Sequence, residues 1–198
     1  LNLMRAAKGL RKANSLWFWS PGKKPSLPSF TERTGLSGSV VCAVDLIKGI
    51  GICAGMHVPY VEGATGTLDT NYRGKADTAL EELKTHDLVY IHVEAPDECG
   101  HQGNTADKIK AIENIDEYIL RPVMKELERR GEHFRLLLLP DHPTPIELRT
   151  HVREPIPFVI YDSEDHPQSG VPSYFDHSGD NGVFVADGDK LIDMLIRK

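Results

Sequence analysis

The 198-residue sequence predicts an α/β fold, with a mainly parallel β-sheet that helices cover on both faces. Two observations predict this class. Short apolar runs rich in β-branched residues alternate with amphipathic segments, which is the order that βαβ units produce. In addition, aspartate and histidine residues follow directly after two of these runs. In parallel sheets, functional residues commonly lie just beyond the carboxyl ends of the strands.

Five apolar runs have the length and composition of buried strands. Glycine, proline or aspartate bounds most of them, and these residues commonly end extended segments. The run over 87–93 is the clearest of the five. The predicted strands are residues 39–44, 58–61, 87–93, 134–139 and 157–161.

Helices are predicted where apolar residues recur at spacings of three and four. The longest begins at Asn104 or Thr105, carries an apolar face from Ile109 to Leu127, and ends at Gly131. A proline-broken loop over 14–28 carries the aromatic cluster at 17–19, a composition more typical of core packing than of ligand binding. The other predicted helices are residues 1–12, 45–55, 75–84 and 189–197.

The bulk composition argues against several functions. A net charge of −6, with no run of lysine and arginine longer than two, argues against a nucleic-acid surface. No apolar stretch approaches the ~18 residues of a membrane-spanning helix. The three cysteines lack CxxC spacing, and no signal peptide is visible, so we expect a reducing, cytoplasmic location.

Three short motifs carry the residue types that ligate divalent metals. The first follows the 87–93 run and the second follows the 134–139 run, so both lie at the same predicted edge of the sheet. Carboxylate and imidazole groups bind Zn²⁺ or Mn²⁺, and five donors exceed what one tetrahedral ion takes, so we expect two metal ions. The candidate ligands are Asp97, His101, Asp141, His142 and His151.

Each motif also has a simpler interpretation when it is taken alone. An Asp-x-x-x-His pair can be a helix cap or a surface pair, and it could lie in a helical turn or in a loop. Adjacent aspartate and histidine residues point in opposite directions on a strand, although Pro140 and Pro143 favour a rigid turn in which both could reach a metal. A lone His151 would usually pack or face solvent. The joint occurrence of the motifs at strand ends favours the metal site.

Two cationic residues are candidates for binding a phosphate or carboxylate group. Lys48 lies on a helix just past a predicted strand, and Arg149 lies two residues before His151. A solvated salt bridge is the alternative for each. The glycine-rich segment 63–66 could bring backbone N–H groups near a phosphate, or could form a plain turn.

With these motifs the chain resembles the cofactor-independent phosphoglycerate mutases, in particular their archaeal-type branch within the alkaline phosphatase superfamily. The resemblance covers nearly the whole chain. The matching segments are 34–44, 48–50, 63–66, 97–104, 112–116, 141–145 and 155–158, together with Lys108 and His151.

The resemblance implies an alkaline phosphatase-like fold and a small phosphorylated hydroxy acid as substrate. One metal would be held by Asp97, His101 and His151. The second would be held by Asp141 and His142, together with an aspartate and the nucleophilic serine of the family. That serine would carry the phosphoryl group while 2-phosphoglycerate and 3-phosphoglycerate interconvert.

No serine of this chain matches the family's nucleophile, and the chain opens at Leu1 inside a predicted helix. We therefore expect a C-terminal part of such an enzyme, catalytically incomplete by itself. Residues 1–33 would be the tail of an inserted lobe with its linker, and residues 34–198 the C-terminal part of the metal-binding domain.

Three alternatives stay open. Residues 148–151 resemble a bacterial subgroup of the branch proposed to phosphorylate homoserine, although no Walker-type glycine loop is present. A phosphatase would use the same scaffold, with water accepting the phosphoryl group. A regulatory relic would keep the fold without the chemistry.

Overall fold

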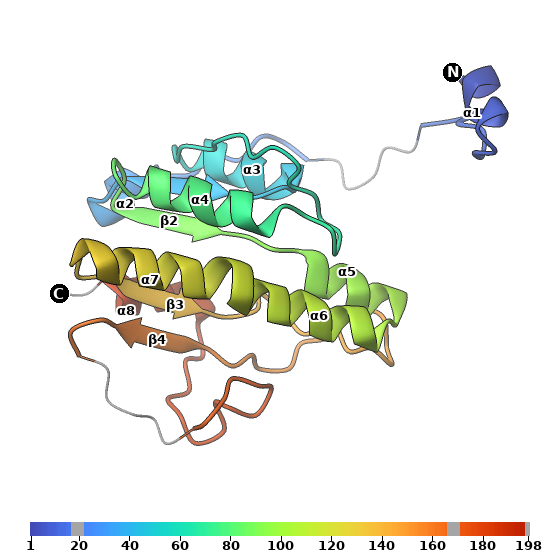
Figure 1. Cartoon of the computed structure of the whole chain (residues 1–198). Helices are drawn as coiled ribbons and strands as arrows, with labels where there is room; N and C mark the ends of the chain where they lie inside the picture. The colour runs from blue at the N-terminus through green and yellow to red at the C-terminus, as the bar shows by residue number, and fades with distance from the viewer. Residues whose placement is uncertain (17–21, 166–170, 197–198) are drawn as a thin grey trace.

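The computed structural model describes residues 1–16, 22–165 and 171–196, and it has the predicted α/β class. Its strands form two pairs, shown in Figure 1. β1 (Gly38–Val41) pairs in parallel with β2 (Leu88–Ile91), with Gly38 opposite Leu88. β3 (Arg135–Leu138) pairs with β4 (Val159–Asp162) in the antiparallel direction, which the sequence did not indicate.

The β1–β2 pair is flanked by α3 (Asp45–Cys53) and α4 (Tyr72–Glu82). All four residues of β1 are buried, as its run of small and β-branched residues predicts. Gly51 of α3 lies directly on this strand, because a Cβ atom there would meet Val40 at 3.0 Å. The helix can therefore approach the strand closely at this position.

The long predicted helix is present, with one interruption. α6 (Thr105–Ile115) begins at the Asn104 cap and α7 (Arg121–Arg130) ends at Gly131, as expected. Between them, residues Asp116–Leu120 form a π-helical segment. Pro122 in the first turn of α7 explains the interruption, because proline cannot donate the backbone hydrogen bond that a regular α-helix requires.

The main core lies between α4 and the π-helical and α7 segments. Tyr72 and Ala76 of α4 pack there with Ile119, Val123 and Leu127, all of which are at most 7% exposed. Burying each of the three aliphatic side chains stabilises the fold by roughly 1.5–3 kcal/mol. This packing fixes the π-helical segment and α7 against α4, whereas α6 packs on α5 (Ala95–Gln102).

Some predicted elements differ from the structure. Residues 58–61 are not a strand, and only a single bridge between Ser39 and His57 forms beside β1. The short α2 (Phe30–Thr34) was not foreseen, although Ser29 and Glu32 form its capping box. The ends of the chain hold shorter helices than predicted, namely α1 (Asn2–Ala7) and α8 (Leu191–Ile196), the latter preceded by the 3₁₀ turn Gly188–Lys190.

Two further observations concern the ends and the surface. α1 has no buried residue and is drawn apart from the other elements in Figure 1. The aromatic cluster at 17–19 lies outside the described residues. Within the described parts of the chain, every helix is too short or too polar to cross a membrane.

Candidate metal centre

The first two predicted ligands lie on α5, which starts four residues after β2 ends. The helix forms because Pro96 suits its first turn, and the carboxylates of Asp97 and Glu98 interact favourably with its positive N-terminal end. Asp97 and His101 are four residues apart in the helix, so they share one face. Of the two arrangements open from the sequence, the helical one is present.

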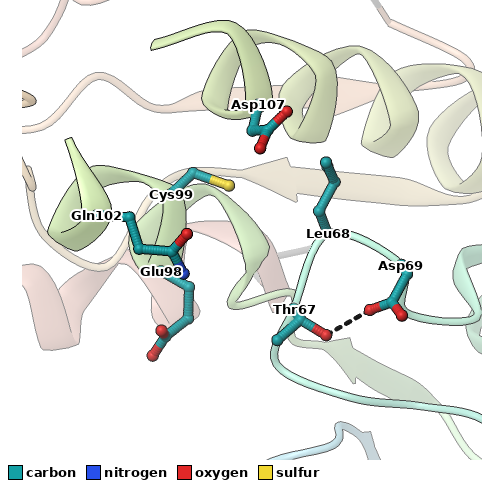
Figure 2. Close-up of a pocket in the computed structure, with 7 residues that line it drawn as sticks. All are labelled: Thr67, Leu68, Asp69, Glu98, Cys99, Gln102 and Asp107. Atoms are coloured by element: carbon teal, nitrogen blue, oxygen red, sulfur yellow. Dashed lines mark hydrogen bonds between the residues drawn. The ribbon is translucent and has the colours of Figure 1, made fainter. Parts of the chain in front are cut away.

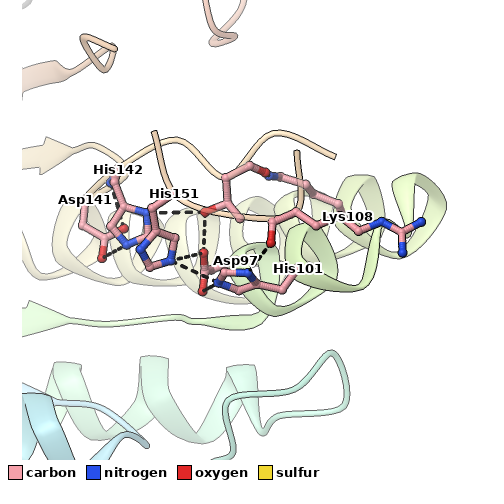
Figure 3. A network of polar contacts seen from close by, with 8 residues as sticks. Asp97, His101, Lys108, Asp141, His142 and His151 are labelled. Carbon is pink, nitrogen blue, oxygen red and sulfur yellow. Dashed lines mark hydrogen bonds and ion pairs between the residues drawn. The ribbon is translucent and has the colours of Figure 1, made fainter. Parts of the chain in front are cut away.

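Asp97, His101 and His151 come together at the carboxyl end of β2, and Figure 3 shows them converging. His101 Nε2 lies 3.3 Å from Asp97 Oδ2, and His151 Nε2 lies 3.2 Å from Asp97 Oδ1. The two Nε2 atoms are 3.1 Å apart. Ligands around a tetrahedral Zn²⁺ at 2.0–2.1 Å are separated by roughly 3.3 Å, so these atoms are already spaced as metal ligands.

The hydrogen bonding of His101 also suits the binding of a metal cation. His101 Nδ1 lies 2.9 Å from the backbone oxygen of Arg149. A carbonyl oxygen can only accept, so Nδ1 carries a proton, and a metal ion would bind the other ring nitrogen, Nε2. Metal-ligating histidines are oriented by this kind of hydrogen bond on the other ring nitrogen. The donors present therefore suit a divalent metal ion.

The second predicted pair lies next to this cluster. Asp141 Oδ2 and His142 Nε2 are 3.2 Å apart, and the His142 ring contacts the His151 ring in a tilted arrangement, with centroids separated by 3.7 Å. The backbone N–H of His142 donates to Asp141 Oδ1 at 3.0 Å, which tightens the turn after β3. All five predicted residues are thus neighbours, in two groups that meet at His151 (Figure 3).

Thr144 and Lys108 support the cluster, and the sequence analysis assigned neither of them a role in the site. The buried Thr144 hydroxyl donates to Asp97, and Lys108 Nζ donates to the Thr144 backbone oxygen at 2.6 Å. Gly100 allows this close approach, since a Cβ atom there would lie 2.7 Å from the same oxygen. The one available sequence signal was Thr144 itself, a hydroxyl residue fixed between Pro143 and Pro145.

Replacing Thr144 by Val should lower the affinity of the cluster for Mn²⁺ or Zn²⁺ by about 10–100-fold, as loss of an outer hydrogen bond to a ligand typically does. The shape is kept, but Asp97 loses its hydroxyl donor. Thr144→Ser keeps the donor and should restore most of the affinity. Metal titration of the two variants checks this, and equal losses in both would contradict the positioning role.

The side chains of the two predicted substrate-binding residues have other partners in the structure. Lys48 pairs with Asp45 at 3.1 Å in the first turn of α3. The Arg149 side chain packs on Gly103, where a Cβ atom would lie 2.5 Å from its Nε. Arg149 also has a left-handed backbone, with φ 54°, which aims its carbonyl at His101. Their role in binding substrate stays a prediction.

The cluster lies in a field of negative charge. Glu94 and Glu98 each place a carboxylate oxygen within 4.8 Å of the other and of Asp97. Burial, and then the nearby carboxylates of Glu98 and Asp97, raise the pKa of Glu94 above its usual range. Such a concentration of carboxylates favours a bound cation.

A pocket of about 300 Å³ opens on another side of α5 (Figure 2). Three of its lining residues are acidic, namely Asp69, Glu98 and Asp107, and among the described residues no lysine or arginine lines it. This charge disfavours a phosphorylated acid, which carries several negative charges of its own. We therefore do not place the substrate there.

Residues 4–192 match the sequence profile of the Metalloenzyme superfamily. The chain belongs to this superfamily. A 2,3-bisphosphoglycerate-independent phosphoglycerate mutase from Methanosarcina acetivorans is 50% identical over 100% of this chain and 50% of its own length. A probable enzyme of the same name from Geobacter sulfurreducens is 49% identical over 97% of this chain and 48% of its own length.

A solved structure of a protein with the same kind of name is also similar to this chain. The cofactor-independent phosphoglycerate mutase from Thermoplasma acidophilum superposes with a TM-score of 0.62 at 27% identity, covering 98% of this chain and 46% of that one. The chain thus spans about half the length of the relatives it matches. Membership of the Metalloenzyme superfamily confirms the predicted α/β class and implies that divalent metal ions are bound.

Proposed function

We propose that the protein is a metal-dependent phosphoglycerate mutase, which interconverts 2-phosphoglycerate and 3-phosphoglycerate through a phosphoserine. The observation that carries this proposal is the convergence of Asp97, His101 and His151, spaced as metal ligands. The similarity to named mutases over the whole chain supports the substrate class.

The five residues divide into two ligand groups. Asp97, His101 and His151 would hold one ion. Asp141 and His142 would contribute to a second, whose remaining ligands would come from the length of the relatives that this chain does not span. When bound, Mn²⁺ or Zn²⁺ ions supply positive charge that stabilises the transferring phosphoryl group.

The residues of this chain would keep the ligands in place. Thr144 fixes the orientation of Asp97, and the Arg149 carbonyl fixes the tautomer of His101. Lys48 and the Arg149 side chain are the cations we propose for the phosphate or carboxylate of the substrate. Movement of either toward the cluster would be needed, because Lys48 pairs with Asp45 and Arg149 packs on Gly103.

Each step of the proposed reaction exchanges one phosphate ester for another, without release of phosphate. A serine oxygen forms a P–O bond as the bond to one glycerate hydroxyl breaks, and that hydroxyl takes up the proton the serine releases. The reverse exchange then delivers the phosphoryl group to the other hydroxyl. No serine of this chain matched the family's nucleophile in the sequence, so we place the nucleophile in the length of the relatives that this chain does not span.

The division at residues 33 and 34 accompanies this proposal. Residues 1–33 would be the tail of an inserted lobe, which agrees with α1 having no buried residue. The remainder would be the C-terminal part of the metal-binding domain. Three free cysteines, two of them buried, suit the reducing cytoplasm that we propose as the location.

The proposed function is tested on the polypeptide as its gene encodes it, supplied with 3-phosphoglycerate and Mn²⁺. Formation of 2-phosphoglycerate, detected through coupling to enolase, is the expected result. Release of inorganic phosphate would instead identify a phosphatase, and phosphorylation of homoserine by ATP would identify a kinase. Lack of all three activities in folded, metal-loaded protein would favour the relic.

A further inference from the structure

A second group of metal-ligating side chains lies at the opposite edge of the β1–β2 pair. His57 bridges to Ser39 near the start of β1, and His86 lies just before β2. Glu82 is the last residue of α4. Asp97 and its partners follow the other end of β2. Four strand residues span roughly 13 Å, so the two groups are separate sites.

The three side chains converge on one oxygen atom. His57 Nδ1 lies 2.7 Å from Glu82 Oε2, and His86 Nδ1 lies 3.4 Å from the same atom. The two rings are stacked, with centroids 5.6 Å apart and planes within 2° of parallel. One ligand atom from each residue lies within 4.8 Å of the others.

The Glu82 carboxylate is the anionic centre of this group. Its side chain is only 13% exposed. Burial raises the pKa of Glu82, but hydrogen bonds from His57 and Ser39 and the charges of His57 and His86 more than offset this, and the pKa lies below its usual range. An ionised carboxylate in such a place requires a positive partner. The hydrogen bond from His57 would be enough to satisfy Oε2 of Glu82, yet the imidazole of His86 also faces this oxygen.

We propose that His57, Glu82 and His86 form a further divalent-cation site, of the Zn²⁺ class. Two imidazoles and one carboxylate are a zinc-binding donor set, and such a set is also suited to Ni²⁺ or Co²⁺. The His57 side chain is 55% exposed, so an ion has access from solvent and water can complete its coordination.

The cation would tie two segments together, the one after α3 and the turn between α4 and β2. His57 belongs to the segment after α3, Glu82 ends α4, and His86 leads into β2. His86 Nδ1 also lies near two other partners, the Thr85 hydroxyl at 3.1 Å and the Glu82 backbone oxygen at 3.2 Å. Binding through Nδ1 would require a small rotation of the ring and the tautomer that carries the proton on Nε2.

The test measures Zn²⁺ binding to the polypeptide as its gene encodes it, carrying Asp97→Ala, Asp141→Ala and His151→Ala, which removes ligands from both ion positions of the other cluster. We expect equilibrium dialysis with metal analysis to find one Zn²⁺ per chain. Adding His57→Ala should weaken this binding at least ~10-fold, because a direct ligand is lost. Absence of bound Zn²⁺, or binding unchanged by His57→Ala, would overturn the proposal.

A matched control is provided by His133, whose Nε2 lies 2.7 Å from Asp162 Oδ1. His133 contacts a carboxylate as His57 does. The second residue that pairs with this carboxylate is Arg135, however, and not a second histidine. His133→Ala should leave Zn²⁺ binding unchanged. An equal loss in both variants would identify adventitious binding to surface histidines and reject the site.

Two measurements remain decisive if the multiple variant does not fold. In the otherwise unmodified chain, His57→Ala should lower the Zn²⁺ count by one. Zinc at about 100 times its Kd should also raise the melting temperature by roughly 5–10 °C through this site, an increment lost in His57→Ala but kept in His133→Ala. The site is rejected if the count and the shift are the same in both.

Discussion

Replacing Asp97 by Asn is expected to reduce the proposed phosphoglycerate mutase activity by more than ~100-fold in the polypeptide as encoded by its gene. The carboxylate of Asp97 lies within 3.3 Å of the Nε2 atoms of both His101 and His151. Asparagine keeps the size of the side chain but removes the charge that a cation would neutralise. Loss of a residue that hydrogen-bonds to a metal ligand typically lowers metal affinity or activity by about 10–100-fold, and loss of the ligand itself should lower it further. Activity assays at saturating and limiting Mn²⁺ check this result.

The control for this variant is Asp180→Asn. Asp180 is an exposed aspartate that lies 3.3 Å from His177 Nδ1, so it also pairs with a histidine, but on the surface. Its substitution should leave activity unchanged. Full activity of Asp97→Asn at limiting Mn²⁺ would refute the proposed ligand set. Partial recovery at high Mn²⁺ would be consistent with a weakened site.

Much of the fold could be predicted because its signals are local. Periodic apolar residues located the long helix, and Asn104 and Gly131 marked its ends. The π-helical segment was missed, because Pro122 can either break a helix or begin a new one and the surrounding pattern decides which. The run over 58–61 was misassigned as a strand. Its composition suits a strand, but pairing beside β1 stops at His57.

The candidate site residues were predicted from their position after strands, and their role as ligands stays a prediction. Strand direction placed Asp97 and Asp141 on one edge, and the structure brings their neighbourhoods together at His151. Thr144 was not found as a supporting residue, since its bond to Asp97 joins positions 47 residues apart. The same reason hid the cluster of His57, Glu82 and His86, where only the last two are close in sequence.

Lys75 is the clearest case of a residue whose environment no local pattern reveals. Lysine normally faces solvent, yet Lys75 is 0% exposed, three residues after Tyr72 and four before Ala79 on the buried face of α4. Its Nζ donates to the backbone oxygen of His92 at 3.0 Å. Burial lowers the pKa of Lys75 to about 8, although the charges of Cys42 and Glu94 oppose this shift.

This lowered pKa makes the stability contribution of Lys75 depend on pH. Between pH 8 and pH 10.5, the unfolded chain holds a proton on Lys75 that the folded chain has released. The free energy of unfolding therefore gains a contribution that rises with pH across this window, by about 3 kcal/mol in total. Below pH 8 both states are protonated, and the full cost of burying the charge is present.

The measurement compares the wild-type chain with Lys75→Met by urea unfolding at several pH values. Comparison is needed because burial raises the pKa of Tyr72 and of Cys42, and each of these destabilises the fold as pH rises. Subtracting the variant cancels those contributions.

The stability of the wild-type chain relative to Lys75→Met should increase by about 3 kcal/mol from pH 8 to pH 10.5. Lys84→Met, a change at a half-exposed lysine beside Glu81, controls for removal of a charge near α4. If the difference for Lys75→Met is constant over this range, then Lys75 is not buried as a titrating ammonium group.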